Sequence, residues 1–167
     1  LVGSEMCIRD RVTVRLNDED GGKKDVSLCD LLEGLKERGT TVPVLFRFRD
    51  LLRSRIAELN DSFRKAIKEA GYQGKYQGVY PIKVNQQRQV VEEIAEFGTK
   101  YDYGLEAGSK PELIAAMAHM HNPNAYLICN GYKDDEFIDL ALTAQKMGLN
   151  IFIAVSYTHL RAHETLS

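Results

Sequence analysis

The sequence predicts an α/β fold built on a parallel sheet. Two observations carry this prediction. From Tyr76 onward, short apolar runs alternate with amphipathic helical segments, and a glycine closes most of those helices. Strand and helix alternating at this pitch form right-handed βαβ units. A chain of 167 residues has no room for eight such units after an N-terminal region, so we expect about half a barrel or an open doubly wound sheet.

Residues 12–75 are predicted to lead into this sheet as one short strand and two helices. The expected order is a strand over 12–16, a Gly-Gly turn over 17–24, a helix capped by Ser27 and stopped at Gly39, an extended stretch over 42–48, and a helix capped by Asp50 that ends near Gly71. Apolar residues at helical spacing in the second helix indicate a packing face, and its Arg and Lys residues indicate a solvated side.

Residues 76–155 are predicted to form the first βα units of the sheet. The expected strands cover 78–84, 101–107, 125–130 and 150–154, and the expected helices cover 86–97, 110–119 and 134–147. Pro111 falls in the first turn of the middle helix, where a proline is tolerated, and Gly148 stops the last one. We expect the carboxyl ends of the strands to meet at one edge of the sheet.

The two terminal segments are predicted to lie outside the native fold. The strings LVGSEMCIRDR (1–11) and SYTHLRAHETLS (156–167) resemble translated sequencing-adapter sequence, and neither has a usable apolar period. His159 and His163 are four residues apart, as zinc ligands on a helix are, but a third ligand is lacking nearby. We therefore predict no metal site there.

The composition narrows the class of partner. A net charge of −2 without a basic stripe argues against nucleic acid and anionic membranes as partners. No apolar run is long enough to span a bilayer and no secretory pattern opens the chain, so we expect a cytoplasmic protein. Cys7, Cys29 and Cys129 are isolated and odd in number, which argues against a disulfide framework.

Lys83 is the strongest candidate for chemistry. It interrupts the apolar run 78–84 near the carboxyl end of a predicted strand, on the same side as Val79 and Pro81. Burial would lower the pKa of this lysine and leave a neutral amine that attacks an aldehyde, for which pyridoxal phosphate (PLP) is the natural candidate. The alternative is a strand-end lysine that reaches water or pairs with a carboxylate.

Polar residues also lie at the ends of the other predicted strands. Glu106 lies at the end of the second strand, Ser109 lies just after it, and Asn130 lies at the end of the third. A carboxylate beside a protonated Schiff base would stabilise it, which makes Glu106 a candidate, although a solvated loop carboxylate is equally compatible with this glycine-rich stretch. Cys129 is interpreted as a packed core thiol and His119 as the close of a helix. No nucleotide-binding glycine fingerprint is present.

Three strings carry a resemblance to a known family. YQGVYPIKVNQQRQV, YGLEAGSKPEL and ICNGYKDDEFIDLAL closely resemble the biosynthetic arginine decarboxylases, which are PLP enzymes, and the resemblance spans about residues 12–154. It implies a partial parallel (β/α) barrel of the alanine-racemase-like type, preceded by a short strand and two helices. It also implies that Lys83 forms the Schiff base with PLP and that Glu106, Ser109 and Asn130 line the cofactor site.

The resemblance further implies a function for the whole protein. That function is decarboxylation of L-arginine to agmatine and CO2 in polyamine and spermidine biosynthesis, by a homo-oligomer with shared active sites and an association with magnesium. The phosphate and pyridine-nitrogen partners of such enzymes lie on later strands and in a C-terminal β domain. We therefore expect this chain alone to be an inactive fragment. Two alternatives stay open: a small PLP-binding barrel or amino-acid racemase, and a non-enzymatic fragment in which Lys83 is structural.

Overall fold

The computed structural model describes residues 6–8, 11–17 and 22–155, and the predicted C-terminal non-native segment 156–167 lies outside these residues. The chain divides into two compact units, Leu1–Arg55 and Ile56–Ser167. The segment boundaries predicted after residues 11, 75 and 155 stay predictions.

The first unit holds a small antiparallel sheet and a helix. Its elements are β1 (Met6–Ile8), β2 (Arg11–Asn17), β3 (Lys23–Ser27) and α1 (Leu28–Glu37), with strand order β1-β2-β3. Ser27 caps α1 as predicted, because its hydroxyl accepts a hydrogen bond from the backbone N–H of Asp30 at 3.4 Å. Arg15 and Asp25 pair across β2 and β3 at 2.7 Å.

Two features of this unit were not predicted. A single strand was expected where three lie, and the segment 1–11, which was expected to form none, contains β1. The reason is that strand pairing uses backbone groups, and a hairpin partner is available within a few residues without any apolar alternation. Whether residues 1–11 belong to the native fold stays a prediction.

Helix α2 (Arg49–Glu69) is long and only partly buried. It begins one residue before Asp50, which lies in the first turn rather than at the cap, and it is followed by Gly71 at φ +62°. Of the predicted apolar stripe, Ile56 is buried, whereas Phe63 is 45% exposed. The Phe63 ring stacks on that of Tyr76 with centroids 3.9 Å apart, which ties the helix to the segment that leads into the second sheet.

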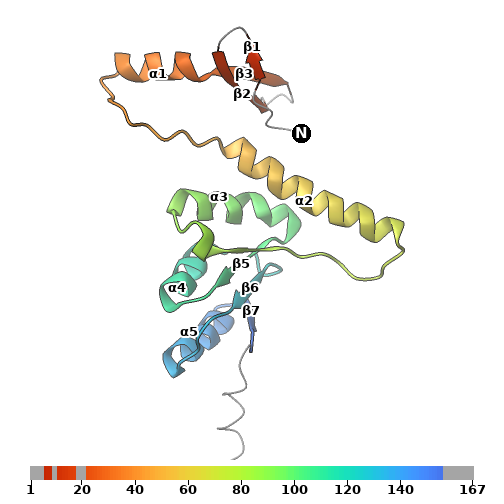
Figure 1. Ribbon diagram of the computed structural model, residues 1–167. Coiled ribbons are helices and arrows are strands. Elements are labelled where there is room, and N and C mark those ends of the chain that lie inside the picture. The colour runs from red at the N-terminus through yellow and green to blue at the C-terminus, as the bar shows by residue number, and fades with distance from the viewer. Residues whose placement is uncertain (1–5, 9–10, 18–21, 156–167) are drawn as a thin grey trace, which may run out of the picture. The chain divides into compact units, whose positions relative to one another are not determined.

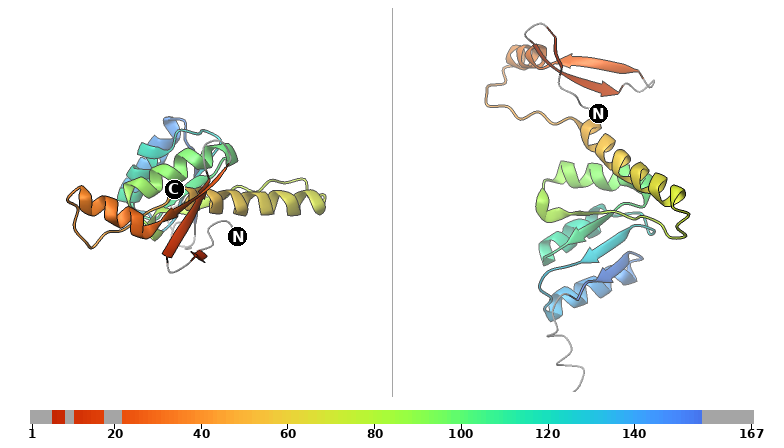
Figure 2. Two further views of the ribbon diagram at one scale, coloured as in Figure 1. Left: turned by 90° about the horizontal axis from the view of Figure 1, so that it is seen from above. Right: turned by 45° about the vertical axis from the view of Figure 1, so that its right-hand side comes forward.

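The second unit contains the predicted parallel sheet. Its strands are β4 (Val79–Pro81), β5 (Gly104–Ala107), β6 (Tyr126–Cys129) and β7 (Asn150–Ile153), in that spatial order. The connections are η1 (Ile82–Val84), α3 (Arg88–Gly98), η2 (Thr99–Tyr101), α4 (Lys110–His119) and α5 (Asp135–Lys146). All three strand pairs are parallel, and α3, α4 and α5 lie along one side of the sheet (Figures 1 and 2). The four strands form a wall of a barrel that these residues do not close.

The core lies between this wall and its helices. Leu105, Leu127 and Cys129 are at most 1% exposed and share the strand face that the helices cover. The helices contribute buried apolar side chains to the same layer, namely Val91, Ile94, Leu113, Ala116, Phe137, Ala141 and Ala144. The opposite face carries Glu106 and Phe152, and Phe152 is 48% exposed. One face is therefore packed and the other is open, as in the inner side of an unclosed barrel.

Strand β4 is shorter than predicted. The expected strand over 78–84 ends at Pro81, and Lys83 lies in the following turn of 3-10 helix. An apolar run of this length does not by itself distinguish a strand from a strand followed by a turn. Pro81 breaks no ladder here, because among the described strands β4 lies at the edge of the sheet.

None of the helices in the described part of the chain is long and apolar enough to cross a membrane.

Candidate active site

The predicted site lies where β4, β5 and β6 end. Lys83, Glu106 and Asn130 come from these three consecutive strands or the residues just after them. Because neighbouring parallel strands end at the same edge of a sheet, the three side chains meet. Ser109 follows β5 at the same edge and occupies the N-cap position of α4. Its hydroxyl makes no capping hydrogen bond to the helix.

Lys83 and Glu106 form an ion pair. The Lys83 Nζ lies 3.6 Å from the Glu106 Oε1, and the side chains are 63% and 16% exposed respectively. The predicted burial of Lys83 is therefore wrong, because the residue sits in the turn of η1 and its amine extends toward the open face of the wall. The carboxylate is the more buried partner, and the amine is accessible to a small aldehyde.

Asn130 is the third member of the site. Its Nδ2 donates a hydrogen bond to Glu106 Oε1 at 3.2 Å, and its Oδ1 accepts one from the backbone N–H of Gly131 at 2.9 Å. Glu106 is thus contacted by a lysine from one neighbouring strand end and by an amide from the other. The structure brings Lys83, Glu106 and Asn130 together as predicted, whereas Ser109 has no hydrogen bond to this group within the described residues.

Glu112 and Gln86 support the site and were missed from the sequence. Glu112 Oε2 accepts a hydrogen bond from the backbone N–H of Gly108 at 2.7 Å, and its Oε1 accepts one from Gln86 Nε2 at 3.1 Å. This carboxylate therefore joins the loop after β4 to the loop after β5. The signal was present, since Ser109 and Glu112 have the S-x-x-E spacing of a capping box.

Asn85 shapes the turn that carries Lys83. Its Oδ1 accepts a hydrogen bond from the Gln87 backbone N–H at 3.0 Å, and its carbonyl accepts one from the Tyr80 hydroxyl at 3.3 Å. Burial raises the pKa of Tyr80, although the bond to the carbonyl acts in the opposite sense. The phenol therefore stays protonated and donating, which anchors the end of η1.

The loops after β5 and β6 are tied by charge as well. Lys110 Nζ lies 2.8 Å from Asp134 Oδ2 and 2.6 Å from Glu136 Oε2. Hydrogen bonds to these two carboxylates raise the pKa of Lys110 to about 12, and the hydrogen bond from Lys110 lowers the pKa of Asp134. Asp134 also caps α5 by accepting from the Phe137 backbone N–H at 2.9 Å. This lysine is held as a cation and is a structural tie.

Cys129 is a core thiol, as predicted. The residue is fully buried, and burial raises the pKa of its thiol to about 11. His119 ends α4, as predicted, and its Nδ1 lies 4.0 Å from Glu92 Oε1. Among the described residues, neither side chain has a hydrogen bond or ion pair with Lys83 or Glu106, so neither is assigned to the candidate site. No group of three potential ligands in the described ranges is placed to hold a metal ion.

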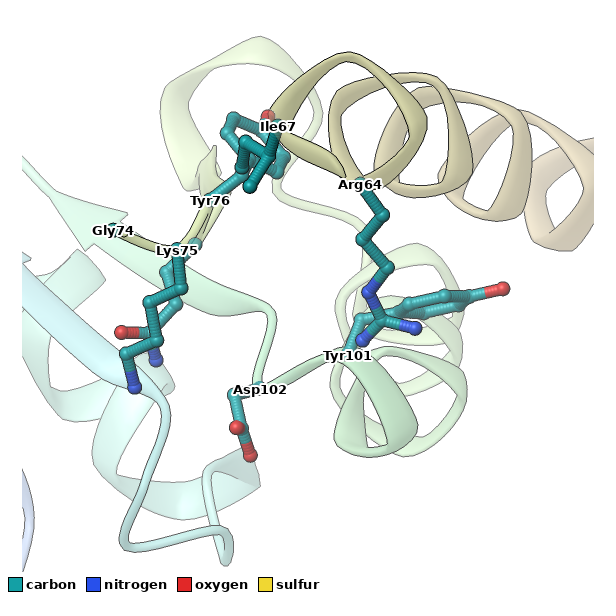
Figure 3. A pocket seen from close by; sticks show the side chains of 8 residues that line it. Arg64, Ile67, Gly74, Lys75, Tyr76, Tyr101 and Asp102 are labelled. Carbon is teal, nitrogen blue, oxygen red and sulfur yellow. The ribbon is translucent and has the colours of Figure 1, made fainter. Parts of the chain in front are cut away.

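A cavity of about 190 Å³ lies at the other end of the strands. Figure 3 shows Arg64 from α2 reaching over the ring of Tyr101, with Lys75 and Asp102 at the opposite side of the hollow. Arg64 Cζ is 4.8 Å from the ring centroid. The lining residues precede β4 and β5 in the chain, so this cavity does not include the candidate site.

Comparison with known protein families identifies the family to which the segment with Lys83, Glu106 and Asn130 belongs. Residues 54–162 match the model of the pyridoxal-binding domain of pyridoxal-dependent decarboxylases. The chain belongs to this family. The match includes Lys83, Glu106 and Asn130, and the parallel βα wall that holds them is the part of the chain that the family describes.

Relatives of known name agree with this membership. The chain is 49% identical over 152 residues to the biosynthetic arginine decarboxylase of Gloeobacter violaceus, covering 91% of this chain and 24% of that protein. It is 57% identical over 120 residues to arginine decarboxylase 1 of rice, Oryza sativa subsp. japonica, covering 70% of this chain and 17% of the rice protein. The chain thus spans about a quarter or less of these relatives.

A crystal structure supports the fold. The biosynthetic arginine decarboxylase of Campylobacter jejuni superposes with a TM-score of 0.83 at 36% identity, over 97% of this chain and 26% of that one. The predicted partial barrel is thereby confirmed.

The residues of the site fit PLP by their chemistry. PLP is an aldehyde and binds a lysine amine covalently, and Lys83 offers such an amine, exposed and beside a carboxylate. The described residues offer no comparable ligand set for magnesium, so no magnesium site is assigned to this segment.

Proposed function

We propose that this chain is the segment of an arginine decarboxylase that holds PLP through Lys83. The observation that carries the proposal is the ion pair between Lys83 and Glu106 at the carboxyl edge of the wall, in a chain of the pyridoxal-dependent decarboxylase family. Glu106 and Asn130 support that lysine, and Ser109 is retained as a residue of the same rim.

Each side chain has a task that follows from its geometry. Lys83 supplies the amine, and its exposure leaves room for an aldehyde to approach. Glu106, more buried than its partner, holds its carboxylate 3.6 Å from that nitrogen and so fixes where the amine lies at the rim. PLP, when bound, supplies the electron-withdrawing ring that accepts the electron pair left by departing CO2.

The substrate proposal is L-arginine, with agmatine and CO2 as products. It is supported by the names of the three relatives described above, each of which is an arginine decarboxylase. None of the three is a racemase, so the alternative of an amino-acid racemase gains no support from them. Assembly into a homo-oligomer with shared sites, a place in polyamine biosynthesis and a cytoplasmic location stay predictions.

The test uses a complete enzyme. We define the chimera as the Gloeobacter violaceus relative in which the segment that this chain matches is replaced by this chain. The chimera is expected to release CO2 from carboxyl-labelled L-arginine, and Lys83→Ala should lower that release by about a hundredfold or more, because the covalent anchor for PLP is lost. The unmodified 167-residue chain should release no more CO2 than free PLP does.

Lys75→Ala is the matched control. Lys75 lines the cavity at the other end of the strands, so its removal should leave turnover within about twofold of the chimera. A Lys83→Ala chimera that retains full turnover would refute the assignment of the lysine. Formation of D-arginine instead of CO2 would replace the proposed reaction by racemisation.

A further inference from the structure

The side-chain amide of Asn130 is engaged at both ends. Its Nδ2 donates to Glu106 Oε1, and its Oδ1 accepts from the backbone N–H of Gly131. The backbone N–H of Asn130 itself donates to the carbonyl of Ala107 at 2.8 Å, which continues the pairing of β5 and β6 by one residue. The orientation of this amide is therefore fixed by its own loop.

That loop is held against its neighbour by a glycine. Gly131 adopts φ +76°, and a Cβ at this position would run into the carbonyl of Gly108 in the loop after β5. Lys133 Nζ donates to the carbonyl of Gly131 at 2.7 Å. Asn130 is thus presented to Glu106 from backbone that is packed and hydrogen-bonded on both sides.

Glu106 Oε1 receives both contacts of the site. Asn130 approaches this oxygen to 3.2 Å and Lys83 to 3.6 Å. A carboxylate with only the exposed lysine as partner would gain little from the pair and could turn away from it. The amide removes that freedom by fixing the oxygen that faces the lysine.

We infer that Asn130 is a positioning residue that acts through Glu106, holding its carboxylate against the Lys83 amine, rather than a residue that touches the cofactor. This inference rests on the proposed function, in which Lys83 binds PLP. The arrangement of the three side chains can nevertheless be tested without PLP. It differs from the role suggested by the resemblance, in which Asn130 lines the cofactor site directly.

The test is reductive methylation of Lys83 in the 167-residue chain at mildly alkaline pH, with each lysine quantified by peptide mass spectrometry. An amine held in an ion pair reacts more slowly with formaldehyde, so the rate reports how fully Glu106 engages Lys83. Asn130→Ala should make Lys83 react about twofold faster, because Glu106 loses its anchor and the ion pair is less populated.

Asn130→Asp should have the opposite effect. The substitution keeps the acceptor for Gly131 and exchanges the donor to Glu106 for an oxygen with negative charge. The added charge near Lys83 should slow methylation about threefold. The added charge acts on Lys83 whatever the role of Asn130, so this variant shows only that the assay detects charge at this position. The distinction between positioning and packing rests on Asn130→Ala and on whether its effect requires Glu106.

Two controls complete the design. Asn122→Asp makes the same change at the other end of the sheet, where Asn122 Nδ2 donates to Asp102 Oδ1 at 3.0 Å, and it should leave the Lys83 rate unchanged. In a Glu106→Ala background, Asn130→Ala should no longer alter the rate, because the intermediary is gone.

The outcomes separate the two proposals. A faster Lys83 rate in Asn130→Ala that disappears in the Glu106→Ala background supports the inference. An unchanged or slower Lys83 rate in Asn130→Ala, or an undiminished effect of Asn130→Ala in the Glu106→Ala background, overturns it. Either result leaves the proposed function standing if Lys83 carries PLP in the chimera. Absence of PLP from Lys83 in the chimera would refute the proposed function. It would not affect the interpretation of the methylation rates.

Discussion

The two ends of the four-stranded wall contain similar residues but organise them differently. At the carboxyl end, Lys83, Glu106 and Asn130 form a chain of polar contacts that joins three strand ends. At the amino end, Arg64 and Tyr101 border a cavity of about 190 Å³ through a contact between a cation and a ring. Among the described residues, the amino end has the cavity but no lysine paired with a carboxylate as Lys83 is with Glu106. The carboxyl end has this pair, and it lies on an open rim.

The cavity and the candidate site therefore lie at opposite ends of the strands. Asn122 contacts Asp102 at the amino end much as Asn130 contacts Glu106 at the carboxyl end. Within the described part of the chain, only the second pair has a lysine amine within 4 Å of its carboxylate. Parallel strands place such groups together at their carboxyl ends, because each strand there continues into a loop on the same side of the sheet.

The largest effect should come from the glycine that locks the carboxyl end. Gly131→Ala is expected to lower the free energy of unfolding by about 3 kcal/mol, since it adds a strained φ and a clash with the Gly108 carbonyl. Gly148→Ala is the control from the amino end, where φ is +96° but an added Cβ would point into open space, and it should cost only about 1 kcal/mol. Urea unfolding measures both. Equal losses would show that the loop contact contributes nothing.

A smaller effect should appear at alkaline pH, through Cys129 in the packed layer behind the site. Burial raises the pKa of this thiol from 9.0 to about 11. The folded state therefore holds a proton that the unfolded state releases first, and this contribution is fully present below about pH 9 and is lost as pH rises through 11. The loss should amount to about 2–3 kcal/mol.

The measurement is the free energy of unfolding as a function of pH for the parent and for Cys129→Ala. The difference between them should shrink as pH rises, because only the parent carries the buried thiol. Cys29, which is exposed, provides the control: Cys29→Ala should leave the pH dependence unchanged. A parent and a Cys129→Ala variant with parallel pH profiles would contradict the burial of Cys129.

Local patterns predicted the elements of the wall well and its contacts poorly. The helix expected over 110–119 has those bounds in the structure, because Pro111 and His119 mark its first and last turns. The turn at Lys83 was missed because the apolar run continues past the end of β4 into η1. Periodicity records which residues are apolar and carries no information on where backbone pairing stops.

The residues of the candidate site could be predicted from the polar residues at the strand ends. The contacts between these residues could not. Lys83, Glu106 and Asn130 could be named because each is polar and lies at the end of a predicted apolar strand. The contact of Asn130 with Glu106 depends on strand register, which pairs Ala107 with Cys129 and so places the residue after Cys129 beside the end of β5. The small sheet of the first unit was missed for a similar reason, because pairing partners are set by backbone geometry.

The central claim is that the arrangement at the strand ends, rather than exposure alone, makes Lys83 the lysine that binds PLP. Lys65 is the internal reference, since it is 75% exposed and lies 3.8 Å from Glu69 on the surface of α2, against 63% and 3.6 Å for Lys83 and Glu106. The chimera would be incubated with PLP, reduced with borohydride, and mapped by peptide mass spectrometry. The account predicts near-complete labelling of Lys83 with little at Lys65, whereas equal labelling of the two lysines, or none at Lys83, would contradict it.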